Sequence, residues 1–258
     1  MKKIQFIGVV LMLTISILSL VKCNSNESLI EEKDELRNKI PLGLVEMKKL
    51  NYDANKMGEI HNLGLSLFIK NNPNYIYTGF NDLTEDINKE FIKGKKDYKL
   101  ESSINYKSLN FYNKSILKSK NASNKSYSEL MDSFIDGNVS KDVQSIFNKI
   151  SINKFTFEET NNFINKEIAN NKNLSIIEIE TLNTFIVIAK HSNDFWTNYI
   201  KNEGENIKSL NRASMRCDAA SQRYMSDAFG FITFGGLGSI GMSWLVYEMQ
   251  EDRGGSCI

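Results

Sequence analysis

Proline, histidine and excess charge are all scarce in this sequence. It holds 2 Pro and 2 His among 258 residues, and its 32 basic and 31 acidic residues leave a formal net charge of +1. So few prolines argue against a loop-rich all-β chain and favour helices. The balanced charge excludes the strong basic field of a dedicated nucleic-acid-binding protein. Hydrophobic residues make up 41% of the chain, which is enough for one sizeable core or two small ones.

Recognisable catalytic and metal-binding patterns are also missing. His61 and His191 lie outside any H-x-x-x-H or H-E-x-x-H pattern and have no cysteine near them in the sequence, so a zinc site lacks its ligands. Residues 236–241 match G-x-G-x-x-G, but only 17 residues follow, too few for a dinucleotide-binding fold. We therefore expect no catalytic residues, no metal and no cofactor, and we expect both histidines to be partly buried helix residues.

The N-terminus has the pattern of an export signal. Two lysines precede an uncharged apolar run that ends at Val21. The next residues complete the segment Leu20-Val21-Lys22-Cys23, which resembles a bacterial lipobox except that Lys22 stands where a small residue is usual. An uncleaved anchor helix and ordinary signal cleavage remain alternatives. We predict a signal peptide, a lipidated cysteine and a polar tether: residues 1–22, Cys23 and residues 23–36.

The longest uncharged run after this signal lies near the C-terminus. Residues 228–247 carry no charge and contain five glycines. Twenty helical residues can span the hydrocarbon core of a bilayer. Gly235, Ser239 and Ser243 would then place small side chains on one helix face, where two helices could pack closely in lipid. Because glycine destabilises helices in water, a hairpin buried against the rest of the protein is the competing prediction.

Cysteine spacing bears on the choice between a membrane span and a buried hairpin. If Cys23 is acylated, Cys217 and Cys257 remain as a pair on either side of the apolar run. An exported chain meets oxidising conditions, so we predict a disulfide between them, closing a loop of about 40 residues. A single straight membrane span would hold the two cysteines apart, so the bond and the span are mutually exclusive.

Between its two ends the chain has helical apolar spacing. Apolar residues recur every three or four positions over about 55–70, 83–91 and 143–150. Thr156-Phe-Glu-Glu159 and Ser175-Ile-Ile-Glu178 are capping-box patterns, which predict helices that begin near 157 and 176. We predict an all-α fold, an irregular helical bundle with a Gly-rich apolar C-terminal hairpin or membrane segment: residues 37–227 and 228–258.

Three motifs carry a resemblance to known sequences. They are the runs Met57-Gly-Glu-Ile-His61-Asn62, Ala189-Lys-His-Ser192-Asn-Asp-Phe-Trp196 and Cys217-Asp-Ala-Ala220, the last leading into the Gly-rich tail. In this order they resemble a loose group of uncharacterised helical secreted proteins and lipoproteins of Bacteroidota. The resemblance implies export and a helical fold. It implies no activity and no functional residues.

These features give three hypotheses about function. The first is an exported lipoprotein of the bacterial cell envelope, at the outer membrane or cell surface, that acts by binding or scaffolding. The second is a membrane-active, pore-forming or bacteriocin-like effector that inserts residues 228–247, and a tail packed fully against the bundle would count against it. The third is an exported helical enzyme with a cleft joining His61 or His191 to a carboxylate. The expected partners are a membrane, through the lipid anchor and, in the second hypothesis, residues 228–247, and a protein of unknown identity. None of the three hypotheses involves nucleic acid.

Overall fold

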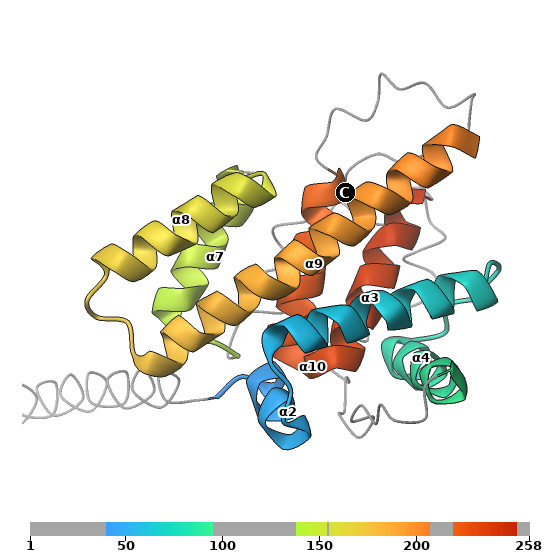
Figure 1. The fold of residues 1–258 in the computed structure, drawn as a ribbon, viewed down its shortest axis with the longest axis horizontal. Helices are drawn as coiled ribbons and strands as arrows, with labels where there is room; N and C mark the ends of the chain where they lie inside the picture. Colours follow the sequence, from blue (N-terminus) through green and yellow to red (C-terminus); the bar gives the residue numbers. More distant parts are fainter. Residues whose placement is uncertain (1–39, 95–137, 154, 207–218, 252–258) are drawn as a thin grey trace, which may run out of the picture.

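The computed structural model describes residues 40–94, 138–153, 155–206 and 219–251, and their regular structure is entirely α-helical (Figure 1). The predicted all-α fold is therefore confirmed. The helices, in chain order, are α2 (Leu42–Leu50), α3 (Ala54–Asn71), α4 (Phe80–Gly94), α7 (Lys141–Asn153), α8 (Phe157–Asn170), α9 (Ile176–Asn206) and α10 (Ala219–Glu251).

Both predicted capping boxes start helices where the sequence places them. At α8 the Thr156 hydroxyl accepts from the Glu159 backbone N–H at 3.3 Å, while the Thr156 N–H donates to the Glu159 carboxylate at 2.8 Å. At α9, Ser175 and Glu178 make the same reciprocal pair at 3.3 and 2.6 Å. Each box satisfies backbone N–H groups that the first helical turn leaves without an intrahelical acceptor.

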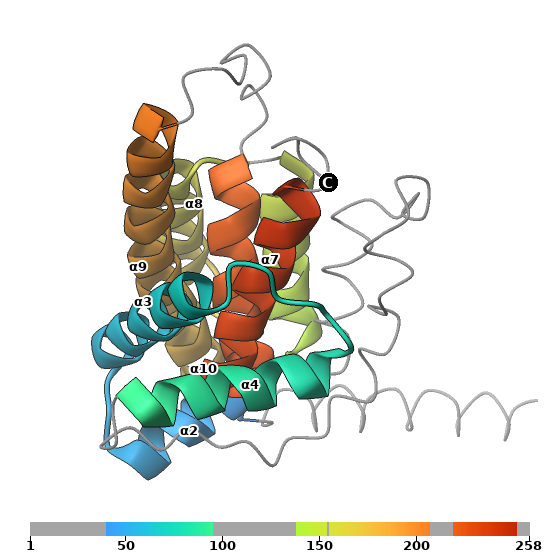
Figure 2. The same cartoon turned by 90° about the vertical axis from the view of Figure 1, so that its right-hand side faces the viewer.

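The apolar C-terminal segment folds as a helical hairpin. Gly235 lies at φ 79° and ψ −168°, outside the helical region, and divides α10 into arms over 219–234 and 236–251. The arms lie side by side (Figure 2). The Ser239 hydroxyl donates across them to the Asp227 carbonyl oxygen at 2.7 Å, and the Gln250 amide donates to the Gln222 side chain at 3.2 Å. Only glycine adopts this backbone conformation without large strain, so Gly235 makes the turn.

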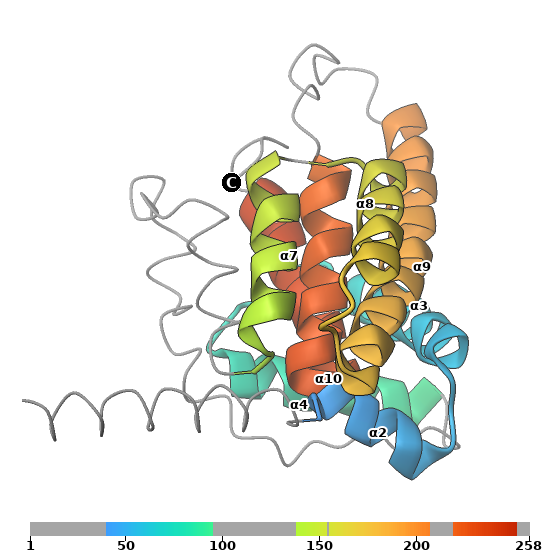
Figure 3. The ribbon, with the colours of Figure 1, turned by 90° about the vertical axis from the view of Figure 1, so that its left-hand side faces the viewer.

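This hairpin is the centre of the bundle. It packs against α9, α2, α3 and α4, while α7 and α8 cover the side opposite α4 (Figures 1 and 3). By length and composition, Ser221–Gln250 is apolar enough to cross a membrane, yet its most apolar window is fully buried inside the protein. Each 16-residue arm measures about 24 Å, shorter than a hydrocarbon core of about 30 Å. The glycine-rich run therefore serves as a folded core in this structure.

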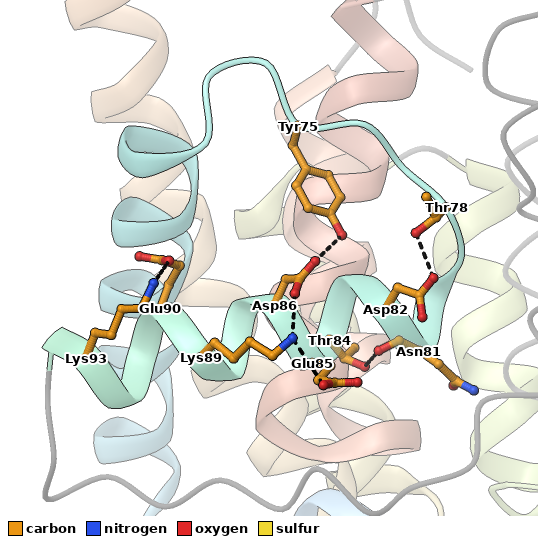
Figure 4. A network of polar contacts seen from close by, with 10 residues as sticks. All are labelled: Tyr75, Thr78, Asn81, Asp82, Thr84, Glu85, Asp86, Lys89, Glu90 and Lys93. Carbon is orange, nitrogen blue, oxygen red and sulfur yellow. Dashed lines mark hydrogen bonds and ion pairs between the residues drawn. The ribbon is translucent and has the colours of Figure 1, made fainter.

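The outer helix α4 shows how the bundle meets solvent. Leu83, Ile87 and Phe91 repeat every four residues and point inward, fully buried. The outward face carries ion pairs three or four residues apart, such as Lys93 to Glu90 at 2.7 Å (Figure 4). Exposed pairs of this kind add little stability. The apolar stripe is therefore what fixes α4 on the hairpin.

Candidate functional site

A cluster of polar side chains lies in the middle of the apolar core. Its centre is Asp227, on the first arm of the hairpin, which has no solvent exposure. One carboxylate oxygen, Oδ2, accepts hydrogen bonds from the Ser192 hydroxyl and, at 3.1 Å, from the Trp196 indole N–H. The same oxygen is 3.4 Å from Nε2 of His61, a ring only 1% exposed. Three elements far apart in the chain thus meet at one carboxylate, and we call these four residues the central cluster.

Helical periodicity explains why these side chains converge. His61 lies on the inward face of α3, one residue after the buried Ile60. Ser192 and Trp196 are four residues apart, so they share one face of α9. Both faces turn toward the first arm of α10, which packs against α3 and α9. The cluster is therefore built by the same periodicity that builds the apolar core.

Burial sets the electrostatics of the cluster. Loss of solvation raises the pKa of the Asp227 carboxyl, and nearby His61 and the donors on Ser192 and Trp196 only partly oppose that increase. Within the described residues, neither the other carboxylate oxygen, Oδ1, nor the buried Ser243 hydroxyl makes a hydrogen bond. In this part of the chain the donors to the carboxyl group therefore lie on one oxygen.

The order of groups in the central cluster differs from that of a catalytic triad. In a catalytic triad the serine hydroxyl hydrogen-bonds to one nitrogen of a histidine, and the carboxylate hydrogen-bonds to the other nitrogen of the same ring. Here the Ser192 hydroxyl donates straight to the carboxylate of Asp227, and His61 lies on the same oxygen. All three side chains are at most 1% exposed, so the group lies in packed interior rather than in a cleft.

His191, the second histidine, lies at the edge of the contact between α3 and α9. Its Nε2 is 3.4 Å from the Asn55 side-chain oxygen, and its backbone carbonyl accepts from the Asn62 amide at 2.9 Å. Partial burial and the neighbouring Lys190 lower the pKa of its ring. Within the described ranges, no group of three or more His, Cys, Asp or Glu residues could hold a metal ion.

A second buried carboxylate holds the hairpin turn. Glu46 on α2 accepts the backbone N–H of Gly236 at 2.5 Å, at the start of the second arm. On the same helix Gly43 lies so close to the hairpin that a Cβ there would overlap the Phe231 carbonyl oxygen. A carboxylate at a helix N-terminus is favoured by the exposed N–H groups and the helix dipole. Helix α2 therefore caps the turn of the hairpin.

At the open end of the hairpin an arginine is enclosed by aromatic rings. Arg223 is 4% exposed, and its Nε donates to the Gln250 side chain on the other arm. Its guanidinium lies 4.5 Å from the centre of the Trp196 ring and 5.1 Å from that of Tyr247. Stacking on π faces stabilises a cation where water is excluded. This contact joins both arms to α9.

The structure places the residues that the sequence singled out in different ways. Cys23, Cys217 and Cys257 lie outside the described residues. For a straight helix we expect Gly235 to share a face with Ser239 and Ser243. It does not, because Gly235 forms the turn between the two arms. The two serines are fully buried on the second arm instead. Helix α10 begins at Ala219, ahead of the predicted division at 227/228, and its hairpin packs against α2, α3, α4 and α9.

The enzyme hypothesis pairs His61 with a carboxylate but does not identify Asp227, and it expects a cleft where the structure has a buried cluster. Asp227 directly precedes the uncharged run, and a lone carboxylate beside such a run is a usable signal of a buried polar site. Comparison of the chain with protein-family models, curated proteins and solved structures finds no match. The resemblance to the Bacteroidota group remains a prediction.

Proposed function

We propose that this protein is an exported lipoprotein of the bacterial cell envelope, attached to a membrane through a lipid on Cys23. The observation that supports this most is the place of the apolar C-terminal run. Because it forms the hairpin at the centre of the bundle, it is already used as protein core. Stable attachment to a membrane then falls to the N-terminal signal and Cys23, which lie ahead of the first described residue.

We further propose that the helical domain acts by binding or scaffolding rather than by catalysis. In the described part of the chain, the arrangement most similar to a catalytic one is the central cluster, and its burial favours a structural role. A bundle whose polar residues fix the packing of its own helices is suited to presenting a rigid surface. The partner of that surface is a protein of unknown identity.

Lipid attachment is tested by metabolic labelling with palmitate. Wild type and Cys23→Ala are compared in the native bacterium, and Cys217→Ala and Cys257→Ala serve as matched controls because they remove the other cysteines one at a time. Label on wild type and both controls, but not on Cys23→Ala, supports the proposal. Label that persists on Cys23→Ala, or an unlabelled wild type, contradicts it.

The membrane-active alternative has one observation in its favour and one against. Ser221–Gln250 has the length and composition of a membrane-crossing helix, but its apolar window is fully packed inside the bundle. Insertion would therefore require the hairpin to leave the protein core. Dye release from anionic liposomes, measured for wild type and for a chain ending before residue 219, would support this alternative only if release depends on the hairpin.

A further inference from the structure

The hydrogen bonds around Asn62 assign one ring proton of His61. The Asn62 side-chain nitrogen donates to the His191 carbonyl oxygen at 2.9 Å, which fixes the orientation of the amide. Its oxygen therefore faces His61, 2.9 Å from Nδ1. An amide oxygen only accepts hydrogen bonds, so the hydrogen must be on Nδ1 of the imidazole. This assignment follows from the network of partners around the ring.

The opposite ring nitrogen then faces a carboxylate. In a neutral imidazole with hydrogen on Nδ1, Nε2 carries only a lone pair, and it is 3.4 Å from Oδ2 of Asp227. Two acceptors in contact in a dry interior repel each other, whereas one proton between them makes an attractive pair. We infer that His61 and Asp227 share one proton, and that this proton holds α3 on the apolar hairpin.

The surroundings of the pair favour keeping that proton. His61 and Asp227 are at most 1% exposed, so a lone aspartate charge there would be poorly solvated. The side chains of α9 that donate hydrogen bonds to Asp227, Ser192 and Trp196, are both uncharged. Burial accordingly raises the pKa of the Asp227 carboxyl.

Few charged groups approach the pair from neighbouring elements. On the second arm the facing group is the Ser243 hydroxyl. Arg223 is held against Trp196 and Gln250, and Glu46 is held at the far turn of the hairpin. On α9, His191 at the rim is close enough to His61 for the two rings to interact electrostatically.

Counting protons predicts how stability depends on pH. An unfolded chain holds one proton on this Asp and His between about pH 4 and 6.5, because free side chains titrate near ~3.9 and ~6.5. The folded pair also holds one, so its contribution is flat in that range. Above about pH 6.5 the unfolded chain loses its proton and the folded pair keeps it. The unfolding equilibrium constant then rises up to about tenfold per pH unit until the folded pair also releases its proton.

Replacing Asp227 by Asn should reverse the direction of this dependence. With its nitrogen in the place of Oδ2, the amide can donate to Nε2 of His61 and to the Ser192 hydroxyl oxygen, at the loss of the Trp196 hydrogen bond. The folded pair then becomes permanently neutral with no shared proton. Below about pH 6.5 the unfolded histidine binds a proton that the folded ring cannot, so Asp227→Asn loses stability as pH falls. Asp194→Asn is the matched control, since Asp194 is an aspartate on α9 whose side chain is 55% exposed.

The experiment combines urea unfolding from pH 5 to 8 with nitrogen NMR of the histidine rings. We expect the urea midpoints of wild type and Asp194→Asn to fall together above pH 6.5, and that of Asp227→Asn to fall below it. Parallel profiles for all three proteins would overturn the inference. If Asp227→Asn does not fold, NMR of wild type decides: a His61 Nε2 resonance that up to pH 8 shows a bound or hydrogen-bonded proton supports the shared proton, and an Nε2 resonance of a bare lone pair overturns it.

Discussion

Substituting the glycine at the hairpin turn tests whether the apolar run is a folded core. Gly235 has φ 79° and ψ −168°, and a Cβ built there would overlap the carboxylate of Glu46. Gly235→Ala therefore imposes two costs at once. The backbone must hold an alanine in a region that is nearly exclusive to glycine, and Glu46 must move off the N–H of Gly236.

The size of the effect follows from these two terms. Backbone strain of this kind costs about 1–3 kcal/mol. Loss of a hydrogen bond to a charged group costs about 1.5–3 kcal/mol. We expect Gly235→Ala to lower the free energy of unfolding by about 2.5–6 kcal/mol, a large part of the ~5–15 kcal/mol typical of a folded domain.

Urea unfolding followed by far-ultraviolet circular dichroism measures this change on the chain from residue 24 onward. Gly79→Ala is the control, because a Cβ at Gly79 meets no atom within 4 Å and its φ is not positive. As Gly79 immediately precedes α4, we expect a loss of no more than about 1 kcal/mol there. Equal, small effects at both positions would refute the assignment of Gly235 as a strained turn clamped by α2.

Three further outcomes are expected. Tyr75→Phe removes the 3.0 Å hydrogen bond to Asp86 shown in Figure 4 and should lower the free energy of unfolding by about 0.5–1.5 kcal/mol in the same urea assay. Because burial raises the pKa of the Tyr75 phenol, wild type should also lose stability as pH rises above about 10. The variant should lose stability less steeply over the same pH range. Ser175→Ala removes the capping hydroxyl of α9 and should cost about 1 kcal/mol, whereas no loss would show that the capping box is dispensable. Alkylation under denaturing, non-reducing conditions followed by intact mass should find neither Cys217 nor Cys257 modified, and two added alkyl groups would contradict the predicted disulfide.

Local signals made much of the fold predictable from the sequence. The boxes at Thr156 and Ser175 specify the starts of α8 and α9, because a capping box depends on residues only three apart. Helix α2 was not predicted, because its nine residues are too few to show a clear helical repeat of apolar residues. Its two signals, Pro41 before the helix and Asn51 in a left-handed conformation after it, are visible only once the helix is known.

The candidate site was less predictable, because its members are distant in sequence. Packing of α3, α9 and the hairpin brings His61, Ser192 and Asp227 together. The sequence around any one of these residues does not identify the other two. Composition could not decide between a membrane span and a buried hairpin either. The deciding feature is the positive φ of Gly235, and the run holds five glycines of equal local character.

Detergent phase partitioning of Cys23→Ala tests whether Cys23 carries the membrane anchor while residues 228–247 form protein core. If lipid on Cys23 is the anchor and residues 228–247 are protein core, wild type should enter the detergent phase with a diacylglycerol mass, and Cys23→Ala should enter the aqueous phase as a folded helical protein. A folded Cys23→Ala protein that remains in the detergent phase would contradict the account. Residues 1–22 or the hairpin itself would then be the membrane anchor.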